Sequence, residues 1–164
     1  MAAGGTIRRI LLYVDGSEEC IAAAQYGIML AKHVNAELMA LYVVNVSMLE
    51  ELVKAKIFVK IEEMDYEQDL EQDGKRYLNY ITELGNSKGV TIKTELTKGV
   101  VNRVVAEKIT EWDIDLMIMG ELEPILSRRD TYHDEAELVF RKAGCSVLVA
   151  KDANRIEQIF NALS

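Results

Sequence analysis

The chain contains little proline and cysteine, and it has fewer basic than acidic residues. Its 164 residues include one proline and two cysteines, Cys20 and Cys145. Basic residues number 19 against 27 acidic ones, so the net charge is −8. Because nucleic-acid backbones are bound by clustered lysine and arginine, this balance argues against DNA and RNA as partners.

Long apolar runs are also missing. No apolar stretch reaches the length of about 18 residues that would span a membrane, and the opening MAAGGTIRR is too short and polar for a secretory signal. We therefore expect a cytoplasmic protein without membrane insertion. Neither Cys20 nor Cys145 has a histidine or a CxxC partner nearby in sequence, so we expect both to be small buried hydrophobes.

What is present is the composition of a globular domain, with 49% apolar and 28% charged residues. Five short apolar runs predict strands, at Ile10–Val14, Leu38–Val44, Val90–Leu96, Leu116–Met119 and Val147–Ala150. The third run alternates apolar and polar residues, which predicts a wetter strand at a sheet edge. A chain of this length buries about two thirds of its unfolded surface as one domain.

Helical spacing of apolar residues appears between these runs. It predicts helices after Ser17, over Val100–Glu111, over Glu135–Lys142 and in a tail at about 153–163. Ser17 is placed to cap the first of them. The alternation predicts an α/β fold, an open five-stranded parallel sheet of Rossmann-like type with helices on both faces and a short C-terminal helix. Ligands of such sheets bind at the carboxyl ends of the strands.

The stretch 47–88 is long for one crossover, and its apolar spacing fits two helical pieces or one bent helix. Acidic residues crowd segment 62–73 within it. A calcium loop is excluded, because counting from Asp65 the sixth position is Leu70 instead of glycine and the twelfth is Arg76 instead of glutamate. Two interpretations of this acidic segment stay open, namely the solvated face of a helix and a mobile excursion of the chain. Arg76 and the preceding lysine are expected to pair with Glu71 or Asp73.

The sequence resembles the universal stress proteins over about residues 7–151. The resemblance rests on ILLYVDGSEECIAAAQYGIMLAKHVNAELMALYVVN, DLMIMG and GCSVLVAKD. It implies one domain over 1–164 in which Asp15 touches adenosine and the backbone near Val43 contacts adenine. From the residues alone, Asp15-Gly16-Ser17 is also a good turn sequence, and the two roles of Asp15 are left open.

Family members that bind ATP carry Gly-x2-Gly-x9-Gly-Ser/Thr after the fourth strand. Here that pattern starts at Gly120, but Glu123, His133 and Asp134 replace the two later glycines and the hydroxyl residue. Side chains there obstruct a phosphate approaching the main chain, and the acids repel it. We therefore predict a degenerate ATP-binding motif that binds ATP weakly or not at all.

Other side chains of this loop have alternative roles. Arg128 and Arg129 either contact a bound anion or are ordinary solvated basic residues of the loop. Asp134 is placed to cap the following helix, and His133 fits a structural role because the only other histidine, His33, belongs to the first helix. We expect no metal site and no cofactor, unless ATP or AMP binds.

No signature of a phosphate-binding loop, a dinucleotide site or an activated nucleophile is present, so we do not expect an enzyme. One hypothesis is a non-enzymatic stress-response or regulatory protein acting through protein contacts. The resemblance implies that it is a homodimer whose last strand, with Val147, Leu148 and Val149, pairs with its copy. The alternative is a nucleotide-responsive switch that binds ATP or AMP between the loops after the first and fourth strands.

Overall fold

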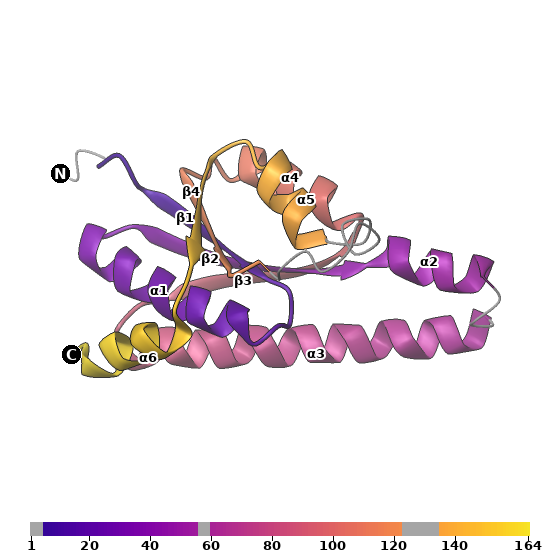
Figure 1. The fold of residues 1–164 in the computed structure, drawn as a ribbon, viewed down its shortest axis with the longest axis horizontal. Helices are drawn as coiled ribbons and strands as arrows, with labels where there is room; N and C mark the ends of the chain where they lie inside the picture. Colours follow the sequence, from indigo (N-terminus) through magenta and orange to yellow (C-terminus); the bar gives the residue numbers. More distant parts are fainter. Residues whose placement is uncertain (1–4, 56–59, 123–134) are drawn as a thin grey trace.

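The structure is a computed structural model that describes residues 5–55, 60–122 and 135–164. The described part contains one parallel sheet with helices on both faces (Figure 1). Its strands are β1 (Arg9–Val14), β2 (Glu37–Asn45), β3 (Ile92–Gly99), β4 (Leu116–Gly120) and β5 (Ser146–Ala150), in the order β3-β2-β1-β4-β5. The predicted fold class, including the open five-stranded parallel sheet, is confirmed.

Two helical layers cover this sheet. The helices are α1 (Glu19–Val34), α2 (Val46–Lys54), α3 (Lys60–Ser87), α4 (Val101–Glu111), α5 (Glu135–Lys142) and α6 (Ala153–Ala162). The first, third and last of them pack on one face, and α4 and α5 pack on the other. The predicted tail helix is therefore present as α6. No helix in the described ranges is long and apolar enough to cross a membrane.

Burial on both faces explains the unbroken apolar runs of the sequence. In β1, Ile10, Leu12 and Val14 face α1 and α3, whereas Leu11 and Tyr13 face α4 and α5. All five side chains are buried. Each fully buried aliphatic side chain contributes about 1.5–3 kcal/mol relative to an exposed one.

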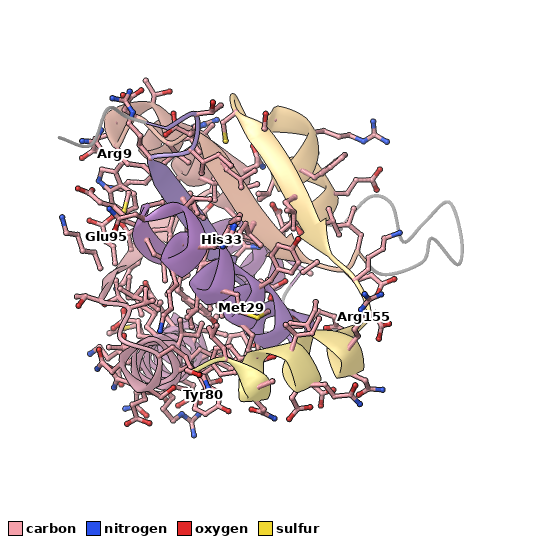
Figure 2. All side chains as sticks on the ribbon, turned by 90° about the vertical axis from the view of Figure 1, so that its left-hand side faces the viewer. Arg9, Met29, His33, Tyr80, Glu95 and Arg155 are labelled. Atoms are coloured by element: carbon pink, nitrogen blue, oxygen red, sulfur yellow. The ribbon has the colours of Figure 1, made fainter. Side chains whose placement is uncertain are left out.

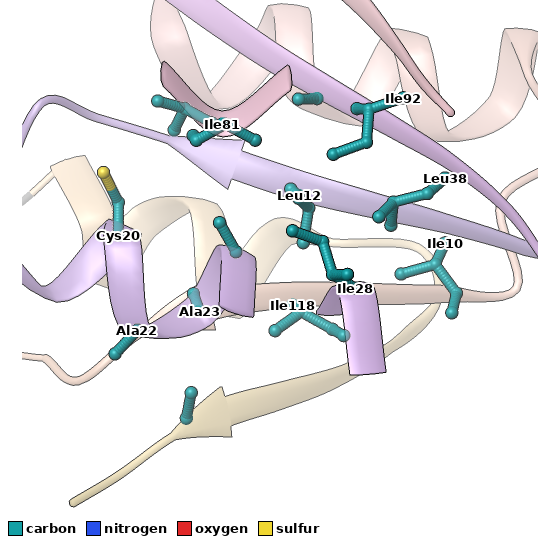
Figure 3. Close-up of a cluster of buried hydrophobic side chains, with 14 of the residues drawn as sticks. Ile10, Leu12, Cys20, Ala22, Ala23, Ile28, Leu38, Ile81, Ile92 and Ile118 are labelled. Atoms are coloured by element: carbon teal, nitrogen blue, oxygen red, sulfur yellow. The ribbon is translucent and has the colours of Figure 1, made fainter. Parts of the chain in front are cut away.

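The larger cluster joins the sheet to α1 (Figure 3). Ile28 of α1 lies over Leu12 and Ile118 of the two central strands, and all three side chains are fully buried. Gly27 lets the helix approach this closely, since a Cβ there would stand 2.4 Å from Leu12 Cδ2. The first helix is thereby fixed against the middle of the sheet.

The third strand lies at one edge, as predicted, but its bounds differ. The backbone N–H of Val90 donates to the carbonyl of Gly85 at 2.8 Å, so Val90 belongs to the turn after α3. The strand begins at Ile92 and continues to Gly99, three residues past the predicted end at Leu96. The prediction failed there because Thr97 and Lys98 pair with β2 through their backbone, whatever their side chains.

The stretch 47–88 forms two helices, and the acidic segment 62–73 lies inside α3 instead of separating them. Figure 1 shows α2 and the first half of α3 side by side beyond the end of the sheet. Burial recurs along α3 at Gly74, Leu78, Ile81 and Gly85, so the helix has one packed stripe and one solvated face. The segment is helical, so the mobile excursion is wrong, and the solvated face is confirmed only in part, because Glu67 and Glu71 are half-buried.

Candidate functional site

A cavity of about 310 Å³ lies at the carboxyl ends of β1, β2 and β4. Asp15 and Val43 line it from the first two strands, and Glu121 and Glu135 line it from the chain after β4 and from α5. Strand order switches between β1 and β4, the place where open α/β sheets bind ligands. The structure thus brings together Asp15 and Val43, the two residues that the family resemblance assigns to adenosine.

Asp15 forms the turn that the sequence favours. Its Oδ1 accepts the backbone N–H of Ser17 at 2.9 Å and the Ser17 hydroxyl at 2.5 Å, and Gly16 between them has a φ of 81°. A positive φ of this size is easy for glycine. The turn role of Asp15 is therefore observed. The side chain is also exposed and lines the cavity, so ligand contact stays a prediction.

The predicted cap of the first helix by Ser17 is wrong. The helix begins at Glu19, and the capping position is occupied by Glu18, whose side chain makes no capping hydrogen bond. Ser17 lies instead in the preceding turn, where its backbone N–H and its hydroxyl both donate to Oδ1 of Asp15.

Gly120 ends β4 against the first turn of α1. A Cβ at Gly120 would lie 2.7 Å from the carbonyl carbon, the carbonyl oxygen and the Cβ of Glu19. The absence of a side chain at this position is therefore required by packing inside the chain. Glycine is required at position 120 whether or not a nucleotide binds. The close contact also places Glu19 and Glu121 at the cavity wall.

The described wall of the cavity is acidic. Asp15, Glu19, Glu121 and Glu135 contribute carboxylates, and no lysine or arginine of the described ranges lines it. The Oε2 atom of Glu135 is buried without a hydrogen-bond partner among these residues. A carboxylate about 4 Å from a phosphate charge costs about 1 kcal/mol in water and about 4 kcal/mol at an effective dielectric of 20. Within the described part of the chain, no cluster of three acidic, histidine or cysteine side chains is arranged to hold a metal ion.

A second cavity of about 650 Å³ adjoins the first on the α3 side. Both are lined by Asp15, Tyr42 and Leu70. The ring of Tyr42 is buried, and its pKa is raised by that burial and then by the negative charge of Asp15. Tyr77 of α3 lies beside it, since a Cβ at Gly16 would stand 3.7 Å from ring carbons of both tyrosines. The helical spacing of apolar residues predicted that α3 has a buried face. It did not predict that residues of this helix line a cavity.

Lys98 at the end of β3 ties α3 to the sheet. Its Nζ lies 2.5 Å from Oε1 of Glu71 and 3.1 Å from Oε1 of Glu67. These hydrogen bonds, first that of Glu71, raise the pKa of Lys98. Asp73 instead pairs with Arg76 on the same helix, one of the predicted pairings. Because Lys98, Glu67 and Glu71 are partly exposed, their ion pairs position α3 more than they stabilise the fold.

Comparison with known proteins decides the family. The model of the universal stress protein family matches residues 6–151. The chain belongs to the universal stress protein family. Universal stress protein MJ0531 of Methanocaldococcus jannaschii is 31% identical over 144 residues, which covers 88% of this chain and 82% of that protein.

Solved structures of other universal stress proteins share the fold. UspA from Lactobacillus plantarum superposes with a TM-score of 0.71 at 21% identity, covering 90% of this chain and all (100%) of that one. A family protein from Arabidopsis thaliana, solved with AMP bound, has a TM-score of 0.61 at 15% identity and covers 90% of this chain and 94% of that chain. At these identities the likeness shows the fold alone.

The family's phosphate loop lies largely outside the described residues. Glu123, Arg128, Arg129, His133 and Asp134 all fall in the range 123–134 that the structure does not describe. The predicted obstruction of the loop, the predicted helix cap and the predicted anion contacts therefore stay predictions.

The last strand of this universal stress protein has an open edge. Within the described residues, β5 pairs with β4 alone. Its Val147 and Val149 pack on the α4 and α5 side, and Leu148 packs on the α1 side, each half-buried. The predicted edge position of this strand is confirmed, whereas its pairing with a second copy stays a prediction.

Neither cysteine is part of a reactive site. Cys20 is buried, and this burial, followed by the charge of Asp15, raises the pKa of its thiol to about 12. Burial also raises the pKa of the half-buried Cys145. The prediction of a small buried hydrophobe is confirmed for Cys20, whereas Cys145 is only half-buried.

Proposed function

We propose that this universal stress protein is a cytoplasmic, non-enzymatic stress-response or regulatory protein that works as a homodimer through protein contacts. The open apolar edge of β5 carries the proposal. An uncovered edge strand exposes unpaired backbone groups that attract other strands, and pairing across a two-fold axis satisfies them. Val147, Leu148 and Val149 lie on this edge.

The cavity at the carboxyl edge supports a role without catalysis. Its one described hydroxyl from a serine, that of Ser17, is held by Asp15 in the turn. The Asp15 carboxylate that accepts this hydroxyl also accepts the backbone N–H of Ser17, and no described histidine, the commonest general base, lines the cavity.

Replacing Leu148 by lysine is expected to dissociate the dimer. Two-fold symmetry would bring the new charges of both copies close together at the same edge, which weakens association by about a hundredfold or more. Sedimentation velocity measures the change, and circular dichroism checks that the variant is folded. Thr94→Lys is the matched control, because Thr94 is exposed on β3 at the opposite edge of the sheet. A folded Leu148→Lys protein with unchanged mass, or a monomeric wild type, would refute the proposed dimer.

A second candidate function is an adenosine or AMP-responsive switch. The observation in its favour is that Asp15 and Val43 line one cavity, whose volume of about 310 Å³ is near the lower end of small-molecule sites. The Arabidopsis relative with bound AMP belongs to the same family. The acidic wall favours a ligand with few phosphate charges over a triphosphate.

AMP is expected to raise the melting temperature if this second function exists. A ligand at 100 times its dissociation constant stabilises a protein by about 2.7 kcal/mol. Asp15→Asn keeps an acceptor for the turn but removes the carboxylate that the family resemblance assigns to adenosine, so the shift produced by adenosine should fall while the unliganded melting temperature stays nearly constant. Differential scanning fluorimetry with adenosine, AMP and ATP provides the measurement. A flat response to all three removes this candidate and leaves the homodimer proposal untouched.

A further inference from the structure

A groove of about 530 Å³ runs between α1 and α6, and it shares no lining residue with the two cavities at the carboxyl edge. Its floor and walls are apolar, with Met29 and Leu30 from α1 and Ile156 and Ile159 from α6. Its volume lies within the range of about 300–1,000 Å³ that is usual for small-molecule sites. Ile159 is 50% exposed, so part of this apolar surface is uncovered in the described chain.

Two basic side chains, Lys151 and Arg155, also line the groove, together with His33 and Asp152. Oδ1 of Asp152 accepts the backbone N–H of Arg155 at 3.2 Å as the cap of α6, so this carboxylate is held at the helix start. Figure 2 shows His33 and Met29 along α1 and Arg155 at the start of α6. Positive side chains therefore gather beside apolar ones in a protein whose net charge is −8.

We propose that this groove binds an amphiphilic anion, namely a carboxylate carried on an unbranched alkyl chain. The chain lies against Met29, Leu30 and Ile159, where the unbranched thioether of Met29 adapts to its shape. The carboxylate meets Arg155, whose planar guanidinium donates two parallel hydrogen bonds, and Lys151 supplies a second positive charge. Apolar walls with two basic side chains among them match this ligand and mismatch a bare phosphate or a neutral lipid.

Titration of the full-length protein with sodium octanoate, decanoate and dodecanoate, each below its micelle concentration, tests the site. Amide resonances of α1 and α6 are expected to shift and saturate. Affinity is expected to rise about fourfold for each added methylene, the fold-change that follows from about 0.8 kcal/mol per buried CH₂. Decyltrimethylammonium, whose alkyl chain is one carbon longer and whose charge is opposite, is expected to bind at least about tenfold more weakly than decanoate.

Two substitutions separate the contributions of charge and apolar surface. Arg155→Glu is expected to weaken decanoate about tenfold or more, whereas Arg103→Glu, the same change on the exposed surface of α4, leaves it unchanged. Ile159→Asp is expected to weaken binding similarly, and the half-exposed position of Ile159 leaves the fold intact. Equal binding of the cationic probe, or full affinity in Arg155→Glu, would overturn the proposal. The absence of saturable shifts with decanoate would also overturn the proposal. If Ile159→Asp then lowered the sedimenting mass, a second copy of the chain would be the occupant of the groove.

Discussion

Replacing Gly120 by alanine is expected to lower the free energy of unfolding by about 2–3 kcal/mol, the range for overpacking a close-packed site. The added methyl would lie 2.7 Å from the backbone carbonyl of Glu19, and backbone moves far less readily than the end of a side chain. Either β4 or the first turn of α1 must shift. Urea denaturation followed by circular dichroism gives the difference between wild type and variant.

Gly144→Ala is the matched control for this substitution. A Cβ at Gly144 meets nothing within 4 Å, and its backbone φ is not positive, so alanine is expected to be neutral or to stabilise by about 0.4–1 kcal/mol. If Gly120→Ala proved as stable as Gly144→Ala, the contact with Glu19 would not be the reason for glycine. The expected loss would show that the first glycine of the family's loop pattern is needed for packing, even in a chain that binds no triphosphate.

Replacing Gly74 by valine is expected to cost about 2–3 kcal/mol, because overpacking against the sheet outweighs the few tenths of a kcal/mol that valine gains over glycine in helix propensity. Gly74 is one of the places where α3 lies against the sheet without a side chain. A Cβ there would stand 2.6 Å from Cδ1 of Tyr42 and 2.7 Å from Cδ1 of Leu96. The ring of Tyr42 is wedged beside Tyr77 and Gly16, so it has little room to move away. Chemical denaturation measures the loss in stability.

Lys75→Val on the next residue is the control for placing a β-branched side chain on this helix without overpacking. Lys75 is exposed on the same helix, so valine there is expected to cost about 0.7 kcal/mol or less. A Gly74→Val protein as stable as Lys75→Val would mean that α3 moves outward freely, and that it does not form a fixed wall of the two cavities.

The fold was predictable from sequence because its strands are buried on both faces. Leu11 and Leu12 point to opposite sides of the sheet and both are buried, so a continuous apolar run was the right signal for a central strand. The edge position of β3 was predictable for the opposite reason, since Lys93 and Thr94 are exposed beside the buried Ile92. The quoted runs then identified the family, which comparison with known proteins confirmed.

Features that depend on partners distant in sequence were not predictable. The half-buried position of Glu67 and Glu71 was not predictable, because Lys98, which binds both, belongs to β3, beyond the end of the helix. Nothing in the sequence around Gly74 indicates that this residue lies against Tyr42. The acidic wall was predictable only in part, since Asp15 was singled out from the sequence but Glu19, Glu121 and Glu135 were not placed around it.

Isothermal titration of magnesium-free and magnesium-bound ATP into protein purified without nucleotide distinguishes a degenerate site from a working one. The four carboxylates of the cavity wall, with no described cation among them, predict a dissociation constant weaker than about 10 μM, which is roughly −7 kcal/mol. Heat that saturates at one ATP per chain with a constant at or below about 10 μM would contradict the proposal that this universal stress protein works through protein contacts with a degenerate ATP site.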